Sequence, residues 1–272
     1  MLRKIAVYVF NLSNIFINRL KGNYFAIFFN TRSKLLNLSL RVHFDGEYYK
    51  LTDKIDKEFT YFFKAEKQGN MAYGKGLKYR LNDLKKSYFL DVIDFSDGDT
   101  FIDCGANVGD LYLVTQKMDI DVKYMGFEPS PKEFSCLKKN VCDMPVHNVG
   151  LWNEEGSLEF YVASQGADSS LIQPKTFEAK TTVKTAPLKN YVDGEIKCLK
   201  LEAEGAEPEI LEGLEDKLAY IEYVTADVGF ERGHSQDSTL PAVTNYLLQN
   251  NFRMISVGQG RLCALYKNKK YD

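Results

Sequence analysis

Histidine, cysteine and long apolar runs are scarce in this sequence of 272 residues, and each scarcity excludes a class of protein. The three histidines include no pair at the spacing of metal ligands, so we expect no metal site. The five cysteines are odd in number and form no C-x-x-C motif, which indicates reduced packing thiols in a cytoplasmic protein. No apolar run reaches the ~18 residues of a transmembrane helix. No small-residue cleavage site follows the apolar stretch near the N-terminus, which argues against a signal peptide.

Acidic residues are absent from the first 44 positions, which carry seven Lys and Arg residues among many large apolar ones. Because the net charge of the whole chain is −2, the remaining residues carry −9. We predict a mainly helical N-terminal extension over residues 1–70, followed by a second domain over residues 71–272. A basic, apolar helix can lie on an anionic membrane surface. It can also dock on the second domain or on another copy of the chain, and the pattern leaves both interpretations open.

A third glycine is missing from the loop that follows the first strongly apolar strand. Residues 99–111 read D-T-F-I-D-C-G-A-N-V-G-D-L, which predicts a strand ending at Asp103 and a tight turn through Gly105, Asn107 and Gly109. An apolar segment typical of a helix then begins at Leu111. This order forms the nucleotide-binding corner of a doubly wound α/β fold. The dinucleotide pattern G-x-G-x-x-G fails, however, and a carboxylate at the strand tip disfavours a bare phosphate.

Beyond this turn, strand-like and helix-like segments alternate, which predicts a doubly wound, mostly parallel sheet. We expect residues 81–95 to form a helix before the first core strand, and residues 155–185 to include an inserted β arm. Glu128 follows the second core strand, 25 residues after Asp103, about where such folds place the acid that binds a ribose. A turn carboxylate in front of Pro129 is the alternative explanation for Glu128.

Acidic side chains end several of the predicted strands, and open α/β sheets bind ligands at this edge. A row of carboxylates suits a ligand with hydroxyls, amines or a sulfonium and repels a polyphosphate, so we expect no nucleic-acid partner. Glu202 ends an apolar strand, where an acid is costly to bury, and Glu207 follows in the same loop. His234, after another strand, could act as a general base. Glu207 could instead stabilise a helix N-terminus, and His234 could be a solvated loop residue.

Four motifs together resemble the FkbM family of S-adenosylmethionine-dependent methyltransferases. They are D-C-G-A-N-V-G at 103–109, F-E-P-S-P at 127–131 with Asn140 downstream, N-V-G-L at 148–151, and L-K-L-E-A-E-G-A-E-P-E-I-L-E-G-L at 199–214. The resemblance covers roughly residues 72–265, and the fourth motif is the most specific. It implies a class I methyltransferase-like Rossmann fold with S-adenosyl-L-methionine as cofactor.

The resemblance, together with the strand-end argument, assigns roles to particular residues. The expected cofactor-binding residues are Asp103, Gly105, Asn107, Gly109, Glu128, Pro129, Gly150 and Leu151. The expected catalytic residues are Glu202, Glu207 and His234. The family usually has Asp where this chain has Glu202. The extra methylene displaces the carboxylate by about 1 Å, and such displacements can cost ~10²-fold in rate.

The activity that the resemblance implies is O-methylation of a hydroxyl, often on a bacterial surface sugar or a secondary metabolite. We therefore expect a sugar or glycan acceptor, in the cytoplasm or at the inner face of the membrane. Two other functions stay open. One is a nicotinamide-dependent oxidoreductase of the same fold class, against which the missing third glycine argues. The other is a non-catalytic cofactor-binding or scaffold protein, for which the departure at Glu202 is the support.

Overall fold

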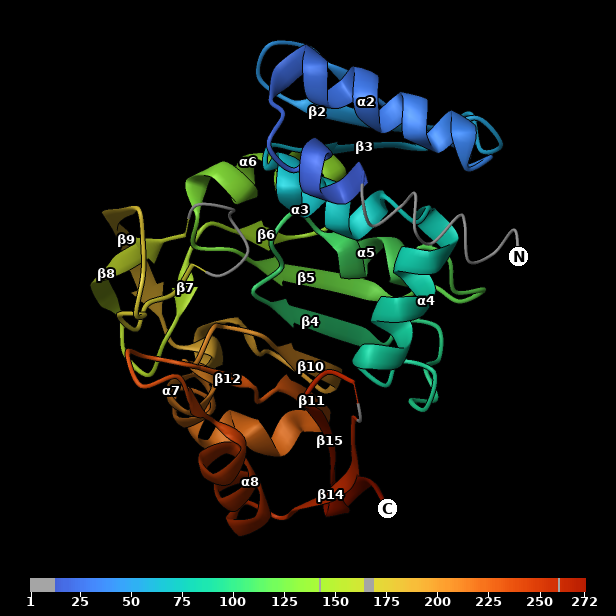
Figure 1. Ribbon diagram of the computed structural model, residues 1–272. Coiled ribbons are helices and arrows are strands. Elements are labelled where there is room, and N and C mark those ends of the chain that lie inside the picture. The colour runs from blue at the N-terminus through green and yellow to red at the C-terminus, as the bar shows by residue number, and fades with distance from the viewer. Residues whose placement is uncertain (1–12, 142, 164–168, 259) are drawn as a thin grey trace.

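The computed structural model describes residues 13–141, 143–163, 169–258 and 260–272, and its centre is a seven-stranded sheet (Figure 1). The strands lie in the order β14-β15-β11-β10-β4-β5-β6. β15 runs antiparallel to both of its neighbours, and the pairs that join β11, β10, β4, β5 and β6 are parallel. Their bounds are β4 (Thr100–Cys104), β5 (Lys123–Phe127), β6 (Val146–His147), β10 (Ile196–Leu201), β11 (Ile221–Asp227), β14 (Phe252–Val257) and β15 (Cys263–Asn268). The predicted doubly wound, mostly parallel sheet is confirmed.

The order of the strands reverses beside β4. From β4 the chain steps outward through β5 to β6, and it then returns to the other side of β4 to form β10 and β11. The carboxyl ends of β4 and β10 therefore lie at a topological switch point, where open α/β sheets bind their ligands.

Both faces of this sheet are covered, so neighbouring residues of one strand belong to different cores. Phe101 of β4 and Cys198 of β10 pack on one face, and Ile102 and Leu199 pack on the other. Such double burial explains why these strands read as continuous apolar runs. Helices on the first face are α4 (Leu77–Ser87), α5 (Asp110–Thr115) and α6 (Pro131–Asn140), and those on the second are α7 (Glu207–Glu212) and α8 (Leu240–Gln249).

The predicted helix over residues 81–95 is wrong in its bounds. α4 ends at Ser87, and Phe89 adopts a left-handed backbone with φ +57°. Leu90, Ile93 and Phe95 are nevertheless buried in the core on the α4 side of the sheet. Their spacing therefore reports burial along an irregular segment rather than a continuous helix.

The inserted β arm is a hairpin with a third strand beside it. β8 (Gly156–Val162) pairs antiparallel with β9 (Ala179–Ala186), and β7 (Gly150–Leu151) pairs parallel with β9. Residues 146–151 are divided between β6 of the main sheet and β7 of the arm. Between these pieces the side-chain amide of Asn148 donates to the carbonyl oxygens of Glu128 and Pro129, at 2.8 and 3.0 Å. Residues 164–168 of the arm lie outside the described residues.

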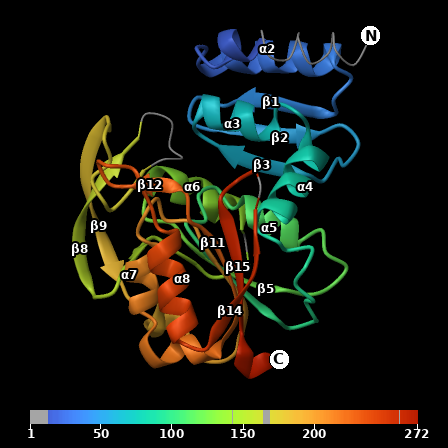
Figure 2. The ribbon, with the colours of Figure 1, turned by 60° about the horizontal axis from the view of Figure 1, so that its bottom comes forward.

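Residues 13–73 form an N-terminal module that lies as a layer beside the main sheet (Figures 1 and 2). Its elements are α2 (Gly22–Leu35), β1 (Leu40–Phe44), β2 (Tyr49–Asp53), β3 (Thr60–Phe63) and α3 (Glu66–Tyr73), and residues 13–17 are also helical. The sequence predicts a mainly helical extension, to which the structure adds an antiparallel sheet of three strands. This sheet is stabilised by buried aromatic rings, since Tyr49, Tyr61 and Phe63 pack in one core with Phe25 of α2. Residues 1–12 of the predicted extension lie outside the described residues.

α2 is apolar on two sides. Phe25 and Phe29 are fully buried within the module, whereas Tyr24, Ile27 and Leu35 are exposed, Leu35 to 74%. The exposed residues recur three, eight and eleven positions apart, so they lie on one side of the helix. One apolar side therefore docks within the chain and the other faces outward. Within the described part of the chain, no helix has the length and apolar character needed to cross a membrane.

The module shares a core with the rest of the chain. Tyr73 of the module is buried together with Val108 and Cys136, which belong to the main fold. The hydroxyl of Tyr61 donates to the carbonyl of Val108 at 2.7 Å, and the side-chain amide of Asn140 donates to the same carbonyl at 2.8 Å. The predicted boundary near residue 70 falls inside α3, so it does not coincide with a gap in packing.

Candidate active site

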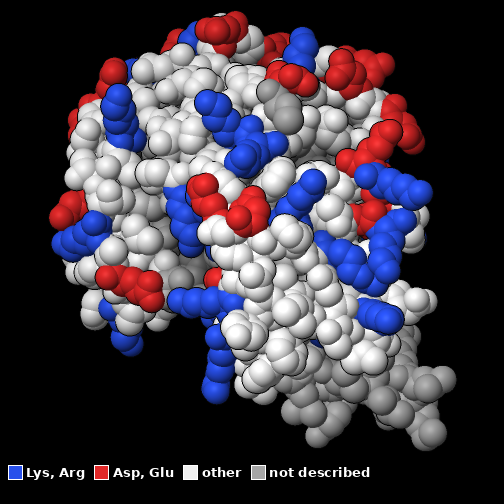
Figure 3. Space-filling view, turned by 90° about the horizontal axis from the view of Figure 1, so that it is seen from above, with Lys and Arg blue, Asp and Glu red and all other residues white. Residues whose placement is uncertain are grey.

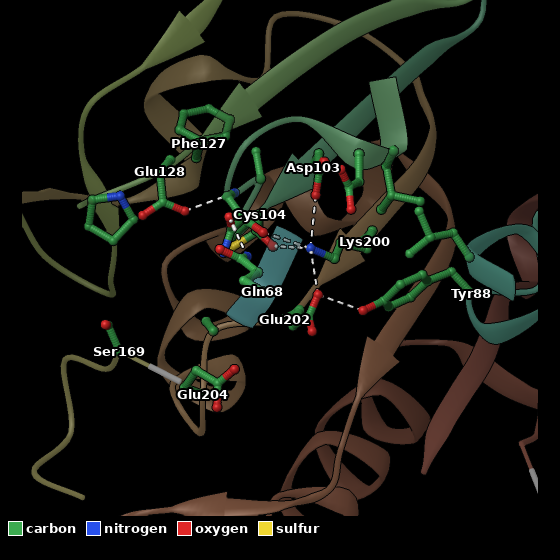
Figure 4. A pocket seen from close by; sticks show the side chains of 18 of the residues that line it. Gln68, Tyr88, Asp103, Cys104, Phe127, Glu128, Ser169, Lys200, Glu202 and Glu204 are labelled. Carbon is green, nitrogen blue, oxygen red and sulfur yellow. Dashed lines mark hydrogen bonds and ion pairs between the residues drawn. The ribbon is translucent and has the colours of Figure 1, made fainter. Parts of the chain in front are cut away.

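A pocket of about 500 Å³ opens at the carboxyl ends of β4, β5 and β10 (Figure 4). Residues of α3, α4 and the β arm complete its lining, and its volume is within the usual range for small-molecule sites. Seven of the eight predicted cofactor residues line this pocket, namely Asp103, Gly105, Asn107, Glu128, Pro129, Gly150 and Leu151. The structure thus brings together residues from three separate sequence motifs.

Two glycines of the predicted turn are required for different reasons. Gly105 has φ +73°, and a Cβ added there would lie 1.9 Å from the carbonyl oxygen of Glu202, so only glycine lets the ends of β4 and β10 meet. Gly109 has φ +95° and precedes α5, but it does not line the pocket. An added Cβ at Gly109 would lie 3.0 Å from Leu137. Gly109 therefore lies outside the pocket that the other seven residues line, and its expected contact with the cofactor stays a prediction.

Glu128 lies where the fold places a ribose-binding acid. Its two carboxylate oxygens accept the backbone N–H groups of Asn107 and Ser130, each at 2.8 Å, and the residue is 6% exposed. Burial raises the pKa of Glu128 to about 8, against the lowering effect of the Ser130 N–H. Each oxygen keeps a further acceptor site, so the carboxyl group is aligned by the turn and can still bind a hydroxyl.

Lys200 is the centre of a buried charge network (Figure 4). Its side chain is 2% exposed, and Nζ lies 2.9 Å from Asp103 Oδ1 and 3.1 Å from Glu202 Oε2. It also donates to the carbonyl oxygens of Cys104 and Gly105, at 3.0 and 2.9 Å. Burial alone would lower the pKa of Lys200, but the carboxylates of Asp103 and Glu202 raise it above its usual value. Lys200 therefore stays charged and holds the glycine-rich turn to the end of β10.

Glu202 is fully engaged by neighbouring donors. Oε2 accepts from Lys200 and from the hydroxyl of Tyr88, the latter at 2.5 Å, and Oε1 pairs with Arg261. Arg261 also pairs with Asp227 at the end of β11. Burial would raise the pKa of Glu202, but Lys200 and Arg261 together lower it to about 2. A carboxylate with so low a pKa accepts protons poorly near neutral pH, so Glu202 is unsuited to be a general base.

Glu231 is an acid of the pocket whose carboxyl group has no hydrogen-bond or ion-pair partner among the described residues. It belongs to β12 (Phe230–Arg232), which pairs with β13 (Asp237–Ser238). Its carboxyl group makes no hydrogen bond or ion pair with any residue that the structure describes. Burial, with the nearby carboxylates of Asp227 and Glu202, raises the pKa of Glu231 to about 8. A carboxyl group with a pKa near the working pH suits a general base.

Two predicted catalytic residues lie outside this pocket. Glu207, at the start of α7, is buried and accepts the backbone N–H groups of Ala203 at 2.8 Å and Gly205 at 3.2 Å. His234 is exposed in the turn between β12 and β13. The expectation that both face the cleft is wrong, because the loop after β10 turns Glu207 back onto its own backbone. The hairpin presents Glu231 to the pocket in place of His234.

The N-terminal module contributes directly to the site. The side-chain amide of Gln68 in α3 donates to Asn107 Oδ1 at 2.8 Å. Asp110, at the start of α5, accepts from the hydroxyl of Tyr73 and from Arg80, whose Nε lies 2.8 Å away. These contacts fix the glycine-rich turn and the start of α5 in addition to the contacts of Lys200.

The pocket suits a ligand with one apolar part and several hydroxyls. Apolar side chains of Phe127, Leu151 and Ile210 lie in the same lining as the aligned carboxyl group of Glu128. In the described ranges, no group of three or more His, Cys, Asp or Glu residues could hold a metal ion. Four cysteines are buried free thiols, and the fifth, at position 142, lies outside the described residues.

Three charged residues of this site were not predicted from the sequence. Lys200 carried a signal, because a lysine between Leu199 and Leu201 in an otherwise apolar strand requires a buried partner. Arg261 and Glu231 carried none, since both reach the pocket from distant hairpins whose fold decides which side chain points inward.

The chain is similar to known proteins in sequence and in fold. The family described as "Methyltransferase FkbM domain" matches residues 103–254, more than half of the chain. "Methyltransferase 1" of Beauveria bassiana (strain ARSEF 2860) is 26% identical over 173 residues, which cover 52% of this chain and 70% of that protein. A crystal structure of Methyltransferase FkbM from Methylobacillus flagellatus KT aligns with a TM-score of 0.47 and 17% identity, over 65% of this chain and 45% of that one. The structure of an rRNA methylase from Streptococcus thermophilus aligns with a TM-score of 0.39 and 14% identity, over 70% of this chain and 97% of that one.

Proposed function

Because this chain belongs to the FkbM family and is a methyltransferase, we propose that it uses S-adenosyl-L-methionine to methylate a hydroxyl of a sugar or glycan precursor. One observation carries the proposal. The pocket at the switch point combines a carboxyl group aligned for a ribose, Glu128, with an unpartnered carboxyl group of raised pKa, Glu231. Family membership also favours methyl transfer over the nicotinamide-dependent alternative.

The cofactor side of the pocket is formed by the turn after β4 and the end of β5. S-adenosyl-L-methionine, when bound, supplies a methyl group that its sulfonium already activates. Glu128 would accept the ribose hydroxyls, and the backbone at Gly105 allows close approach. Asp103 is almost fully buried and bound to Lys200 and to the hydroxyl of Tyr124, so it acts through the turn that it supports.

The acceptor side is formed by β12 and the ends of β10 and β11. Glu231 is the residue that we assign as proton acceptor for the attacking hydroxyl, because it has no competing partner there. Glu202 keeps its negative charge through Lys200 and Arg261 and is a positioning residue. The side chain of Glu202, one methylene longer than the Asp usual in the family, pairs with both Lys200 and Arg261. Such a complete network supports an active enzyme over a protein that has lost its activity.

Calorimetry with the purified full chain tests the cofactor assignment. S-adenosylhomocysteine should bind and NAD should not. The Glu128→Ala variant should bind S-adenosylhomocysteine more weakly by about 1–3 kcal/mol, as expected when the buried ribose hydroxyls lose their hydrogen-bond partner. Glu154→Ala, which removes an exposed acid outside the pocket, is the matched control. Equal affinities in the two variants would contradict the ribose assignment.

A methyl-label transfer screen tests the acceptor class. Radiolabelled S-adenosyl-L-methionine would be incubated with the enzyme and with pools of nucleotide sugars, oligosaccharides, amines and RNA. Label should appear in a saccharide fraction and resist mild acid, as expected for a methyl ether. Transfer to amines or RNA alone would contradict O-methylation of a sugar.

The exposed side of α2 supports a location at the cytoplasmic face of a membrane. Ile27 and Leu35 are 57% and 74% exposed, and Lys21 and Lys34 on the same helix or its cap are exposed as well. Apolar side chains flanked by lysines suit an anionic bilayer surface. The competing occupant is a second copy of the chain, which sedimentation of the pure protein would reveal.

A further inference from the structure

A second hollow, of about 860 Å³, lies between the N-terminal module and α4. Its lining carries seven basic residues against two acidic ones, although the chain as a whole has a net charge of −2. We call this hollow the basic groove. Its basic residues are Lys34, Arg41, Lys54, Lys75, Lys78, Lys85 and Lys117, and its acidic residues are Asp53 and Asp56.

Most of this positive charge is not neutralised within the chain. Lys117 pairs with Asp56 at 3.2 Å, and Asp53 accepts the hydroxyl of Ser39 at 2.8 Å. The lysine side chains with no hydrogen-bond or ion-pair partner among the described residues are those of Lys34, Lys54, Lys78 and Lys85. Figure 3 shows basic side chains gathered along one side of the face that carries the module. An excess of like charge in a hollow attracts anions.

α4 separates the basic groove from the active-site pocket. Leu84 and Tyr88 line the pocket, whereas Leu81 and Lys85 line the groove. Residues three or four apart share one side of a helix, so the two hollows lie on two sides of the same helix.

The two hollows meet at the N-terminal end of α4. Lys75 and Tyr79 line both of them. The Lys75 ammonium lies 4.5 Å from the centre of the Tyr79 ring and donates to the Tyr79 hydroxyl at 3.2 Å. A chain-like ligand can therefore run from the groove over this rim into the pocket without leaving the lined surface.

We propose that the basic groove binds the acidic part of an elongated acceptor, a glycan chain with carboxylate or phosphate groups, while a hydroxyl of that chain enters the active-site pocket. The proposal rests on the methyltransferase function proposed above and specifies its substrate class. Lysines in the groove would contact the acidic groups, and Tyr79 at the rim offers an aromatic face and a hydroxyl to a sugar ring.

The lining of the groove favours a glycan over the other polyanions. Grooves for single-stranded nucleic acids stack bases on several aromatic side chains, whereas Tyr79 is the one aromatic residue among the groove residues that the structure describes. The sequence pI of about 6.0 also differs from the strongly basic character of nucleic-acid-binding domains. A bilayer is flat on this scale and fits the outward side of α2 better than a concave groove.

Binding of a fluorescent hexagalacturonate to the full chain tests the proposal, with maltohexaose as the neutral counterpart. The groove variant is Lys54→Glu/Lys78→Glu. The matched control is Lys184→Glu/Lys269→Glu, which changes the net charge equally at exposed lysines outside both hollows. Hexagalacturonate should bind, more weakly as salt rises. The groove variant should bind it roughly tenfold more weakly, because two attractive charges become repulsive. The control should stay within about twofold of the unmodified protein, and S-adenosylhomocysteine affinity should be unchanged in both variants.

The outcomes separate this proposal from the function on which it rests. Equal hexagalacturonate affinity in the groove variant and the control overturns the groove assignment, as does equally tight binding of maltohexaose. Tighter binding of an RNA hexamer or of anionic vesicles, lost in the groove variant, also overturns it and assigns the groove to that polyanion. If hexagalacturonate binds through the groove but S-adenosylhomocysteine does not bind at all, the groove stands and the methyltransferase function fails.

Discussion

Replacing Glu231 with Gln should lower kcat by about 10²–10⁴-fold, the usual contribution of a positioned general base. The substitution preserves the size of the side chain and removes only its ability to accept a proton. Glu231 contacts no other described side chain through a hydrogen bond or ion pair, so the fold and the affinity for S-adenosylhomocysteine should change little. Single-turnover methyl transfer and calorimetry measure the two quantities separately.

The pH dependence of the methyl-transfer rate tests the role of Glu231 most directly. With a pKa of about 8, only about a tenth of Glu231 is ionised at pH 7. The rate should therefore rise about tenfold between pH 7 and pH 9 and then level off. A sulfonium is cationic and favours the ionised carboxylate, so the apparent pKa in kcat should be lower than that in kcat/KM for the methyl donor.

Glu202→Gln is the matched control for this experiment. Glu202 has a pKa of about 2 and cannot produce a transition near pH 8. Its amide variant should be slower, because Lys200 and Arg261 lose their shared partner, but its rate should still rise through pH 8. If Glu231→Gln also keeps that rise, the proton acceptor is another group and the assignment is wrong.

Three further predictions follow from local geometry. Gly105→Ala should lower the free energy of unfolding by about 1–3 kcal/mol more than Gly98→Ala in urea titrations. Both glycines have positive φ, but nothing lies within 4 Å of an added Cβ at Gly98, so equal losses would contradict the close approach at Gly105. As pH falls from 5 to 2, the unmodified protein should lose about 3 kcal/mol more stability than Glu202→Gln. The pKa of Glu202 is lowered in the folded protein, so its ionised carboxylate stabilises the fold at pH 5 and progressively less as the pH falls toward 2. Equal acid sensitivity of the unmodified protein and Glu202→Gln would contradict this reasoning. The full chain should float with anionic vesicles at low salt and less at high salt, and Ile27→Ser/Leu35→Ser should not float. Unchanged flotation of that variant would exclude the exposed side of α2 as the contact.

The sheet and the cofactor side of the pocket could be predicted from sequence because both depend on short-range patterns. The turn that follows Asp103 and the acid at Glu128 each lie directly after a buried strand. Parallel strands then bring their carboxyl ends to one edge, so position along the chain translates into position in space. Gly109 is the exception, since a glycine required by the turn and a glycine required by a ligand look alike in sequence.

The acceptor side could not be predicted in this way because it depends on how loops reverse. Glu207 and Glu202 are five residues apart, yet one lines the pocket and the other binds backbone N–H groups beneath it. Glu231 and His234 are three residues apart on one hairpin, yet Glu231 lines the pocket and His234 is exposed outside it. The direction of the chain in such loops depends on residues with a left-handed backbone, such as Glu204 with φ +51°. A non-glycine residue in this conformation cannot be recognised from the sequence.

The two interpretations of the basic N-terminal extension also could not be separated from sequence, since α2 carries apolar residues on two of its sides. Phe25 and Phe29 are buried within the N-terminal module itself, and Tyr24, Ile27 and Leu35 leave an apolar side exposed, so both interpretations stay predictions. A helix that is apolar all round is usually buried all round. Here the sheet that covers one side has no counterpart on the other within the described residues.

The N-terminal module contacts the glycine-rich turn of the active-site pocket as well as forming its own core. Tyr61 donates to the carbonyl of Val108 inside the glycine-rich turn, Gln68 donates to Asn107, and Tyr73 holds Asp110 at the start of α5. A displacement of about 1 Å in a positioning group can cost ~10²-fold in rate. The same module forms one wall of the basic groove, and α4 forms the other. An acceptor bound in that groove would therefore rest on the elements that hold the glycine-rich turn in place, which gives a physical reason for the module to stay packed against the main sheet.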